Sequence, residues 1–264
     1  MKEKNNYIFM VGFPRSGTTL AQTIVMTDDE VFSFPETHYF TKAIRFRKAP
    51  EFLSNLWTSI YCYNWIKKNL GKNKLLYSFS RDELAKKFFY YLDDIAKSKG
   101  KSIVLEKTPA HLYHIEEIMR LIPNAKFIHV TRDCDGAVKS LMKASSQWKV
   151  KSDLNKTIAR WLHDNFLSHC YLRRDNNFEM KFESLVSNRE IVIDELNNAF
   201  DMHLTTTTNS ELATKAKEVV CKDEIWKSNN LQGNRPKLSE PDTTEYSNLI
   251  ESFMENKGIN DKAN

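Results

Sequence analysis

The amino-acid sequence predicts an α/β protein with three layers, in which a central, mainly parallel β-sheet is flanked by helices. Short apolar runs typical of buried strands alternate along the chain with longer segments of helical periodicity. Each run stops at a turn or a polar residue, so we expect ligand-binding groups at the carboxyl ends of the strands. Because no repeat or low-complexity segment interrupts the 264 residues, we expect a single domain over 1–264.

The predicted strands and helices follow one another in regular order. Apolar, β-favouring runs that stop at Gly, Pro or a charged residue predict strands at 7–12, 31–34, 102–105, 126–131 and 178–182. Apolar residues three or four positions apart predict helices over 18–26, 51–70, 81–97, 109–122, 135–144, 154–173 and 188–200. Pro109 is well placed to begin its helix. Segments 40–97 and 145–175 are predicted to be helical insertions, and 227–241 a loop.

Composition and charge exclude several classes of protein. The net charge of +5 and the pI near 8.8 are only mildly basic and come without a long basic run, so they do not indicate nucleic-acid binding. No apolar stretch approaches the roughly 20 residues that span a bilayer, and the charged start of the chain is unlike a signal peptide. We therefore expect a soluble, cytoplasmic protein.

The cysteines and histidines show no metal-binding pattern. The four cysteines lie far apart, without a CxxC pair or a histidine at ligand spacing, and predict free thiols in a reducing compartment: Cys62, Cys134, Cys170 and Cys221. His111 and His114 lack an accompanying HExxH motif, so they are interpreted as polar surface residues of a helix. The sequence predicts no metal site.

The segment GFPRSGTT at 12–19 has the form of a phosphate-binding loop. It follows a predicted strand and opens a predicted helix, so backbone N–H groups and the positive helix end can face an anion. Nucleoside triphosphatases carry a lysine where this chain has Thr18, and here the cation is Arg15, inside the loop. This P-loop-like segment suits a phosphosulfate better than a triphosphate with its metal ion. A purely structural Gly-Ser turn is the alternative.

Arg132 and Ser140 form a second candidate anion site. Arg132 ends a predicted strand, and Ser140 lies eight residues later, about two helical turns along the next helix. Both side chains could reach one anionic group, such as a single 3′-phosphate. The alternative is an Arg132 paired with the neighbouring Asp133 and a Ser140 that faces solvent.

These motifs together resemble the sulfotransferase superfamily that uses 3′-phosphoadenosine 5′-phosphosulfate (PAPS). PRSGTT at 14–19 is similar to the family's 5′-phosphosulfate loop, and TRDCDGAVKS at 131–140 is similar to its 3′-phosphate signature. PETHYF, EKTPAH and PNAKFIHVTRD resemble the branch that includes bacterial sulfotransferases and protein-tyrosine sulfotransferases. KFESLVSN at 181–188 resembles a further family segment, with Phe182 where a tyrosine is frequent. The resemblance extends from about Tyr7 to Ala144 and fades toward the C-terminus.

The resemblance implies a P-loop-like fold and roles for individual residues. Glu36 is the expected general base, with His38 as the competing base. Arg15 and Lys107 would stabilise the sulfuryl group and the departing 5′-phosphate. The residues implied to bind PAPS, and its product 3′-phosphoadenosine 5′-phosphate (PAP), are Arg15, Ser16, Gly17, Thr18, Thr19, Arg132 and Ser140. Further candidates, for a loop that covers the nucleotide, are Lys227, Asn234 and Arg235.

Several alternatives remain open from the sequence. Glu36 could cap the following helix, and Lys107 could be a surface lysine. A P-loop kinase or nucleotide hydrolase could use Glu106 as an acidic metal ligand, and an inactive PAP-binding protein could keep the loop without the chemistry. The acceptor hydroxyl, or less favoured amine, could belong to a small molecule, carbohydrate, lipid or peptide. The following aromatic residues could line its pocket or belong to the core: Trp57, Tyr61, Tyr63, Trp65, Phe89 and Tyr90. The oligomeric state is open.

Overall fold

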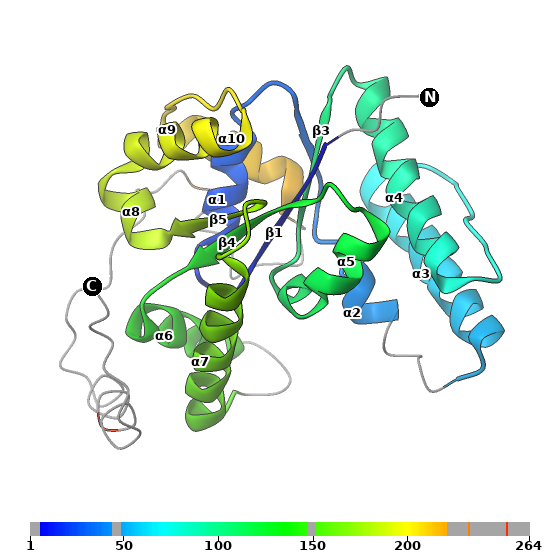
Figure 1. Cartoon of the computed structure of the whole chain (residues 1–264), viewed down its shortest axis with the longest axis horizontal. Helices are drawn as coiled ribbons and strands as arrows, with labels where there is room; N and C mark the ends of the chain where they lie inside the picture. The colour runs from blue at the N-terminus through cyan, green and yellow to red at the C-terminus, as the bar shows by residue number, and fades with distance from the viewer. Residues whose placement is uncertain (1–5, 44–48, 147–151, 221–231, 233–251, 253–264) are drawn as a thin grey trace.

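Five strands form one sheet in the order β2-β3-β1-β4-β5, and every neighbouring pair is parallel (Figure 1). The strands are β1 (Asn6–Gly12), β2 (Val31–Ser33), β3 (Ile103–Lys107), β4 (Lys126–Thr131) and β5 (Asn177–Lys181). This computed structural model describes residues 6–43, 49–146 and 152–220, together with 232 and 252. The predicted α/β fold with a parallel central sheet is confirmed, and β1, β3 and β4 end side by side.

Helices cover both faces of the sheet and complete the three layers. Figure 1 shows α1, α8, α9 and α10 on one side, and α2, α3, α4 and α5 on the other. The helices are α1 (Thr18–Val25), α2 (Tyr39–Ala43), α3 (Glu51–Leu70), α4 (Arg81–Ser98), the 3₁₀ helix η2 (Pro109–His114), α5 (Ile115–Leu121), α6 (Cys134–Ser145), α7 (Leu154–Tyr171), α8 (Phe182–Ser187), α9 (Arg189–Phe200) and α10 (Asn209–Val219). In the described ranges, none combines the length and apolar character needed to cross a bilayer.

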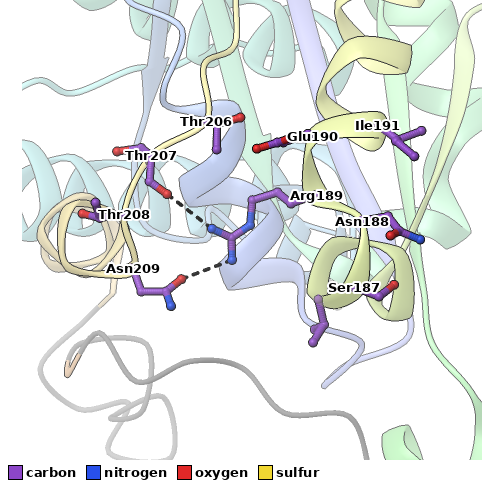
Figure 2. Close-up of a pocket in the computed structure, with 10 residues that line it drawn as sticks. Ser187, Asn188, Arg189, Glu190, Ile191, Thr206, Thr207, Thr208 and Asn209 are labelled. Atoms are coloured by element: carbon purple, nitrogen blue, oxygen red, sulfur yellow. Dashed lines mark hydrogen bonds between the residues drawn. The ribbon is translucent and has the colours of Figure 1, made fainter.

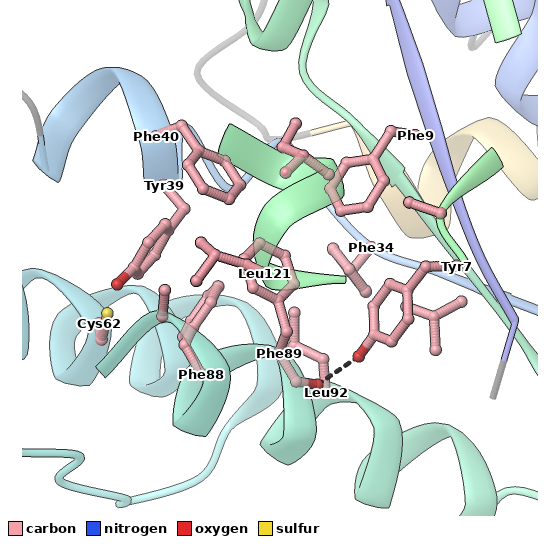
Figure 3. Close-up of a cluster of buried hydrophobic side chains, with 14 of the residues drawn as sticks. Tyr7, Phe9, Phe34, Tyr39, Phe40, Cys62, Phe88, Phe89, Leu92 and Leu121 are labelled. Atoms are coloured by element: carbon pink, nitrogen blue, oxygen red, sulfur yellow. Dashed lines mark hydrogen bonds between the residues drawn. The ribbon is translucent and has the colours of Figure 1, made fainter. Parts of the chain in front are cut away.

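Alternate residues of β1 belong to two separate hydrophobic clusters, one on each face of the sheet. Tyr7 and Phe9 pack with Phe88 and Phe89 of α4 (Figure 3), whereas Ile8 and Met10 pack beneath α1. Because successive side chains of a strand point to opposite faces, a strand covered on both sides must be apolar throughout, as the run YIFMV is. Burial of each large side chain contributes about 1.5–3 kcal/mol. The two clusters therefore fix the central strand from which the phosphate loop starts.

The structure departs from the predicted elements at several places, among them α2, which was not predicted, and β3, which extends to Lys107. Phe182, predicted to end a strand, begins α8 instead. Pro109 begins a 3₁₀ helix before the α-helix proper, and its position at the first helical turn is the predicted one. Helix α10 was not predicted, although Thr208 and Glu211 form a capping box at its start, which is a sequence signal.

The free thiols of three cysteines agree with the prediction. Cys62 and Cys134 are buried and Cys170 is exposed, each as a free cysteine. Cys221 lies outside the described residues.

Candidate active site

The phosphate loop turns sharply between β1 and α1. Gly12 has φ +142° and Gly17 has φ +88°, and a Cβ at Gly12 would lie 2.3 Å from the carbonyl oxygen of Val130. Only glycine fits at such a close approach of two backbones. Arg15 also has a positive φ, of 75°, which is uncommon for a residue with a side chain and typical of functional loops. The turn thus places the Arg15 side chain at the carboxyl end of β1.

The N-terminus of α1 follows a buried hydroxyl that has no hydrogen-bond partner in the part of the chain that the structure describes. Thr18 and Thr19 are the first residues of α1, so their N–H groups point out of the helix end. The Ser16 Oγ atom is buried and makes no hydrogen bond to any described residue. A buried polar atom without a partner is uncommon in a folded protein, and an anion bound by the loop would satisfy it. These donors fit the 5′-phosphate end of a nucleotide.

Arg132 and Ser140 meet the phosphate loop directly. The Arg15 Nε atom donates to Ser140 Oγ at 3.3 Å, and Arg132 Nη1 donates to the Arg15 carbonyl oxygen at 3.3 Å. Burial lowers the pKa of Arg132, opposed by the nearby carboxylates of Asp133, Glu183 and Asp135. A buried guanidinium at the sheet edge favours an anionic ligand. The two predicted anion sites are therefore on the same edge and in contact.

Phe182 connects these two parts of the site. The Arg132 guanidinium lies 4.2 Å from the centroid of the Phe182 ring, in cation–π geometry. The same ring faces Gly17, where a Cβ would lie 2.4 Å from Phe182 Cδ2. The Trp161 indole donates to the Arg132 carbonyl oxygen at 3.0 Å and fixes its backbone from the other side. The role of Phe182 in ordering the loop was not predicted from the sequence.

Glu36 and Lys107 form a buried ion pair beside the loop. The Lys107 Nζ atom lies 2.5 Å from Glu36 Oε1, and the Lys107 side chain is 0% exposed, so it is not the surface lysine of the alternative interpretation. Glu36 is 15% exposed, and its Oε2 lies 3.4 Å from His38 Nε2. Burial lowers the pKa of His38, opposed by the charges of Glu36 and Glu106. Both candidate bases therefore lie in one cluster with the cation.

A fully buried carboxylate, that of Glu106, holds the backbone on both sides of this ion pair. Its Oε1 accepts hydrogen bonds from Thr37 N at 3.2 Å, Thr37 Oγ1 at 2.7 Å and Thr108 Oγ1 at 2.6 Å. Its Oε2 lies 2.8 Å from His111 Nδ1. Burial raises the pKa of Glu106, but the charge of His111 and the hydrogen bonds from His111, Thr108 and Thr37 lower it by more, so the net shift is downward. Both oxygens are thus occupied by protein groups.

The prediction that His111 is a surface residue was wrong. His111 is completely buried and contacts Glu106, because η2 turns its side chain toward the sheet rather than toward solvent. Its sequence neighbours gave no sign of this contact.

Helix α3 supports the loop that carries Glu36. The Trp65 Nε1 atom donates to the Glu36 carbonyl oxygen at 3.0 Å, and Tyr61 Oη donates to the Thr37 carbonyl oxygen at 2.5 Å. Of the aromatic residues considered for an acceptor pocket, Trp65 and Phe89 belong to the core, whereas Trp57 and Tyr90 are exposed. The Glu36 loop is therefore held by β3 on one side and α3 on the other.

A cavity of about 560 Å³ lies away from these residues, between the start of α9 and the start of α10 (Figure 2). Arg189 crosses it and donates to the Thr207 carbonyl oxygen at 3.4 Å and to Asn209 Oδ1 at 3.2 Å. None of the predicted catalytic residues lines this cavity.

The candidate residues of a nucleotide-covering loop cannot be placed, and the described residues form no metal-binding cluster. Lys227, Asn234 and Arg235 lie outside the described residues. Within the described ranges, no group of three or more His, Cys, Asp or Glu side chains is arranged to hold a metal ion.

The fold is similar to that of several solved sulfotransferases. The sulfotransferase domain of the Synechococcus PCC 7002 olefin synthase gives a TM-score of 0.55 at 15% identity, covering 96% of both chains. The sulfotransferase domain from the curacin biosynthetic pathway gives 0.56 at 14% identity, covering 98% of this chain and 99% of the other. Mouse sulfotransferase SULT7A1, complexed with PAP, gives 0.52 at 10% identity, covering 99% and 86%. At these identities the similarity concerns the fold.

Sequence comparison identifies the family. A stretch of 136 residues, 50% of this chain, is 29% identical to an uncharacterized protein of Aquifex aeolicus (strain VF5), of which the match spans only 16%. The model of the sulfotransferase family matches residues 7–206, which include the phosphate loop, Glu36, Lys107 and the Arg132 site. The chain therefore belongs to the sulfotransferase family.

Proposed function

We propose that this chain transfers a sulfuryl group from PAPS to a hydroxyl, or less favourably an amine, of an acceptor. The observation that carries the proposal is the convergence of three groups at one edge of the sheet. These are the phosphate loop after β1, the Arg132–Ser140 site after β4 and the Glu36–Lys107 ion pair beside β3. β1 pairs with both β3 and β4, so the three groups are neighbours.

The two anion sites match the two ends of a PAPS molecule. Ser16, Gly17, Thr18 and Thr19 would hold the 5′-phosphosulfate through the helix N-terminus and the unpartnered Ser16 hydroxyl. Arg132 and Ser140 would hold the 3′-phosphate, since a buried guanidinium binds a phosphate well. Contact between Arg15 and Ser140 supports a single nucleotide that occupies both sites.

Glu36 is the proposed general base, and Arg15 and Lys107 stabilise developing negative charge. Glu36 takes the proton of the acceptor hydroxyl while the acceptor oxygen forms its bond to sulfur and the bond between sulfur and the 5′-phosphate oxygen breaks. Lys107 and Arg15 offset the charge that moves onto the departing phosphate. The Lys107 Nζ atom lies 2.5 Å from Glu36 Oε1. This contact supports the proposal, because the proposed base and a cation that can stabilise the leaving phosphate lie side by side.

The test is a combination of binding and transfer. Calorimetry of the purified chain with PAP should show binding without added metal, and a screen of hydroxyl acceptors with ³⁵S-labelled PAPS should show transfer. Glu36→Gln should lower the transfer rate by about 10²- to 10⁴-fold and leave the PAP affinity within about twofold. His38→Gln is the matched control, since it should change the rate far less if Glu36 is the base.

Three outcomes separate the alternatives. Binding of PAP with no transfer to any acceptor would favour an inactive nucleotide-binding protein. Turnover of ATP with Mg²⁺ would favour a kinase or hydrolase, for which Glu106 is poorly suited because its oxygens already accept hydrogen bonds from Thr37 and Thr108 and contact His111. Equal loss of transfer in the two variants would make the assignment of the base to Glu36 wrong.

A further inference from the structure

Helix α3 exposes a continuous row of large apolar side chains. Phe52, Leu53, Leu56, Trp57 and Ile60 are between 37% and 57% exposed, and their spacing places them on one side of the helix. We refer to these five residues as the apolar face of α3. Eight of the twelve large apolar residues exposed in the described ranges lie in α3 or the loop that follows it, the other three there being Leu75, Tyr77 and Phe79. Exposed apolar residues concentrated in this way mark an interaction surface.

The polarity of α3 is the reverse of what a helix on a water-facing surface shows. Its buried side carries small polar residues, such as Thr58 and Ser59, whose hydroxyls donate to carbonyl oxygens of the same helix. Residues 52–66 include no charged side chain, although five of them face outward as the apolar face. A helix that faced water would place charges there. Packing inside this chain involves the buried side of α3, so it does not account for the exposed apolar face.

The sequence segment that contains α3 is strongly basic. Between Glu36 and Asp82 the chain has nine lysines and arginines and one acidic residue, Glu51, which is a net charge of +8. The rest of the chain, with 30 basic and 33 acidic residues, carries −3. The basic residues of this segment that the structure describes are Lys42, Lys67, Lys68, Lys72, Lys74 and Arg81. An apolar helix face bordered by lysines is typical of helices that lie in the interface of an anionic membrane.

We propose that the apolar face of α3 docks on the surface of an anionic lipid bilayer. Phe52, Leu56 and Ile60 would enter the boundary between headgroups and acyl chains, and Lys67 and Lys68 would contact the lipid phosphates. Charge decides between this occupant and a second copy of the chain. Two apolar faces packed against each other would bring two segments of +8 together, whereas an anionic headgroup layer complements them.

The proposed surface adjoins the candidate active site. Trp57, Tyr61 and Trp65 are four residues apart and follow one line along α3. Tyr61 and Trp65 bind the backbone of Thr37 and Glu36, so Trp57 lies one turn before the Glu36 loop. Figure 1 shows α3 at the edge of the molecule together with α4, and α3 contacts both α4 and α2. Docking would therefore bring the bilayer near the Glu36 loop, but the docking itself does not depend on the proposed function.

The test is sedimentation of the full chain with lipid vesicles. The chain should pellet with vesicles of phosphatidylcholine and phosphatidylglycerol, and much less with phosphatidylcholine alone. Phe52→Ser combined with Leu56→Ser should weaken binding about tenfold or more, because two apolar side chains no longer enter the lipid. Lys67→Gln combined with Lys68→Gln should weaken it by about thirtyfold, at about 1 kcal/mol per lysine.

Matched controls separate the surface from general effects. Phe166 of α7 and Ile191 of α9 are 69% and 57% exposed, so Phe166→Ser combined with Ile191→Ser removes comparable apolar area elsewhere and should leave vesicle binding unchanged. Lys217→Gln, on α10, is the control for charge. Melting temperature and PAP affinity should be the same for all variants, which shows that each has folded.

The vesicle-binding results of the unaltered chain and its variants can support or overturn docking on the bilayer. Binding to anionic vesicles that is lost only in the α3 variants supports the proposal. Absence of binding to anionic vesicles by the unaltered chain would overturn it, as would an equal loss in the control variants. A dimer in solution that the α3 variants dissociate, without vesicle binding, would instead identify a second copy as the occupant.

Discussion

Replacement of Glu106 by glutamine tests how the Glu36 loop is held in place. The variant keeps the shape of the side chain and removes its charge. Glutamine retains one oxygen for Thr37 and Thr108, but its NH₂ group replaces the oxygen that lies 2.8 Å from His111 Nδ1. One hydrogen bond to a charged group contributes about 1.5–3 kcal/mol, and the bonds from the threonines weaken as well. We expect a loss of about 3 kcal/mol in the free energy of unfolding.

Thermal unfolding and steady-state kinetics give the readout. At about 2–4 °C per kcal/mol, the melting temperature should fall by about 6–12 °C. Transfer should fall about tenfold or more at saturating donor, because Glu36 and Lys107 are displaced, while PAP affinity stays within about twofold. The pKa of Glu106 is lowered in the folded chain, so its charge stabilises the fold above the ordinary glutamate pKa. That stability is lost as the pH falls through the lowered value, and Glu106→Gln should not show this loss.

Glu179→Gln is the matched control for this prediction. Glu179 also lies on a strand and accepts a threonine hydroxyl, from Thr131 at 2.9 Å, but its side chain is 34% exposed. It should change the melting temperature by less than about 2 °C. If Glu106→Gln behaved like the control, the buried carboxylate would not be what anchors the loop.

Three further predictions concern the phosphate loop, the second anion site and a buried histidine. Gly17→Ala should lower the free energy of unfolding by about 1–3 kcal/mol and weaken PAP binding, because the φ of Gly17 is +88° and the new Cβ would collide with the Phe182 ring. An unchanged melting temperature would contradict this backbone strain. Ser140→Ala removes the hydroxyl that accepts from Arg15, and calorimetry should show PAP binding about tenfold weaker with stability unchanged; full affinity would exclude Ser140 from the nucleotide site. Burial lowers the pKa of His129 from 6.5 to about 4, so between pH 6.5 and pH 4 the unfolded chain binds a proton that the folded chain does not. The free energy of unfolding should therefore fall by up to about 3 kcal/mol as the pH drops from 6.5 to 4. Urea titrations of His129→Gln should show a smaller decrease over this pH range.

Much of the framework could be predicted because it depends on local patterns. The run at 7–12 is apolar, and the run at 126–131 is largely apolar but includes the buried His129; both became strands covered on two faces, β1 and β4. The position of each motif at or just after the end of a strand was enough to place Arg15, Lys107 and Arg132 at one edge of a parallel sheet.

The contacts that organise the site could not be predicted in the same way. Glu106 and Thr37 are 69 residues apart, and Arg15 and Ser140 are 125 apart, so only the completed sheet brings them together. His111 has the sequence surroundings of a surface residue, and its burial follows from the turn of η2 toward Glu106. No periodicity in the sequence records such a contact.

The support of the Glu36 loop by α3 makes the position of Glu36 sensitive to packing at a distance. Trp65 holds the Glu36 carbonyl oxygen, and its own ring packs edge-on against Phe34 and Phe88, with centroids 5.6 Å away in both cases. A change in the interior between α3 and α4, such as Phe88→Leu, would thus tilt the indole and move Glu36, the proposed base, although Phe88 is not among the proposed site residues. If the proposed function holds, a defect in sulfuryl transfer can therefore originate in the hydrophobic interior.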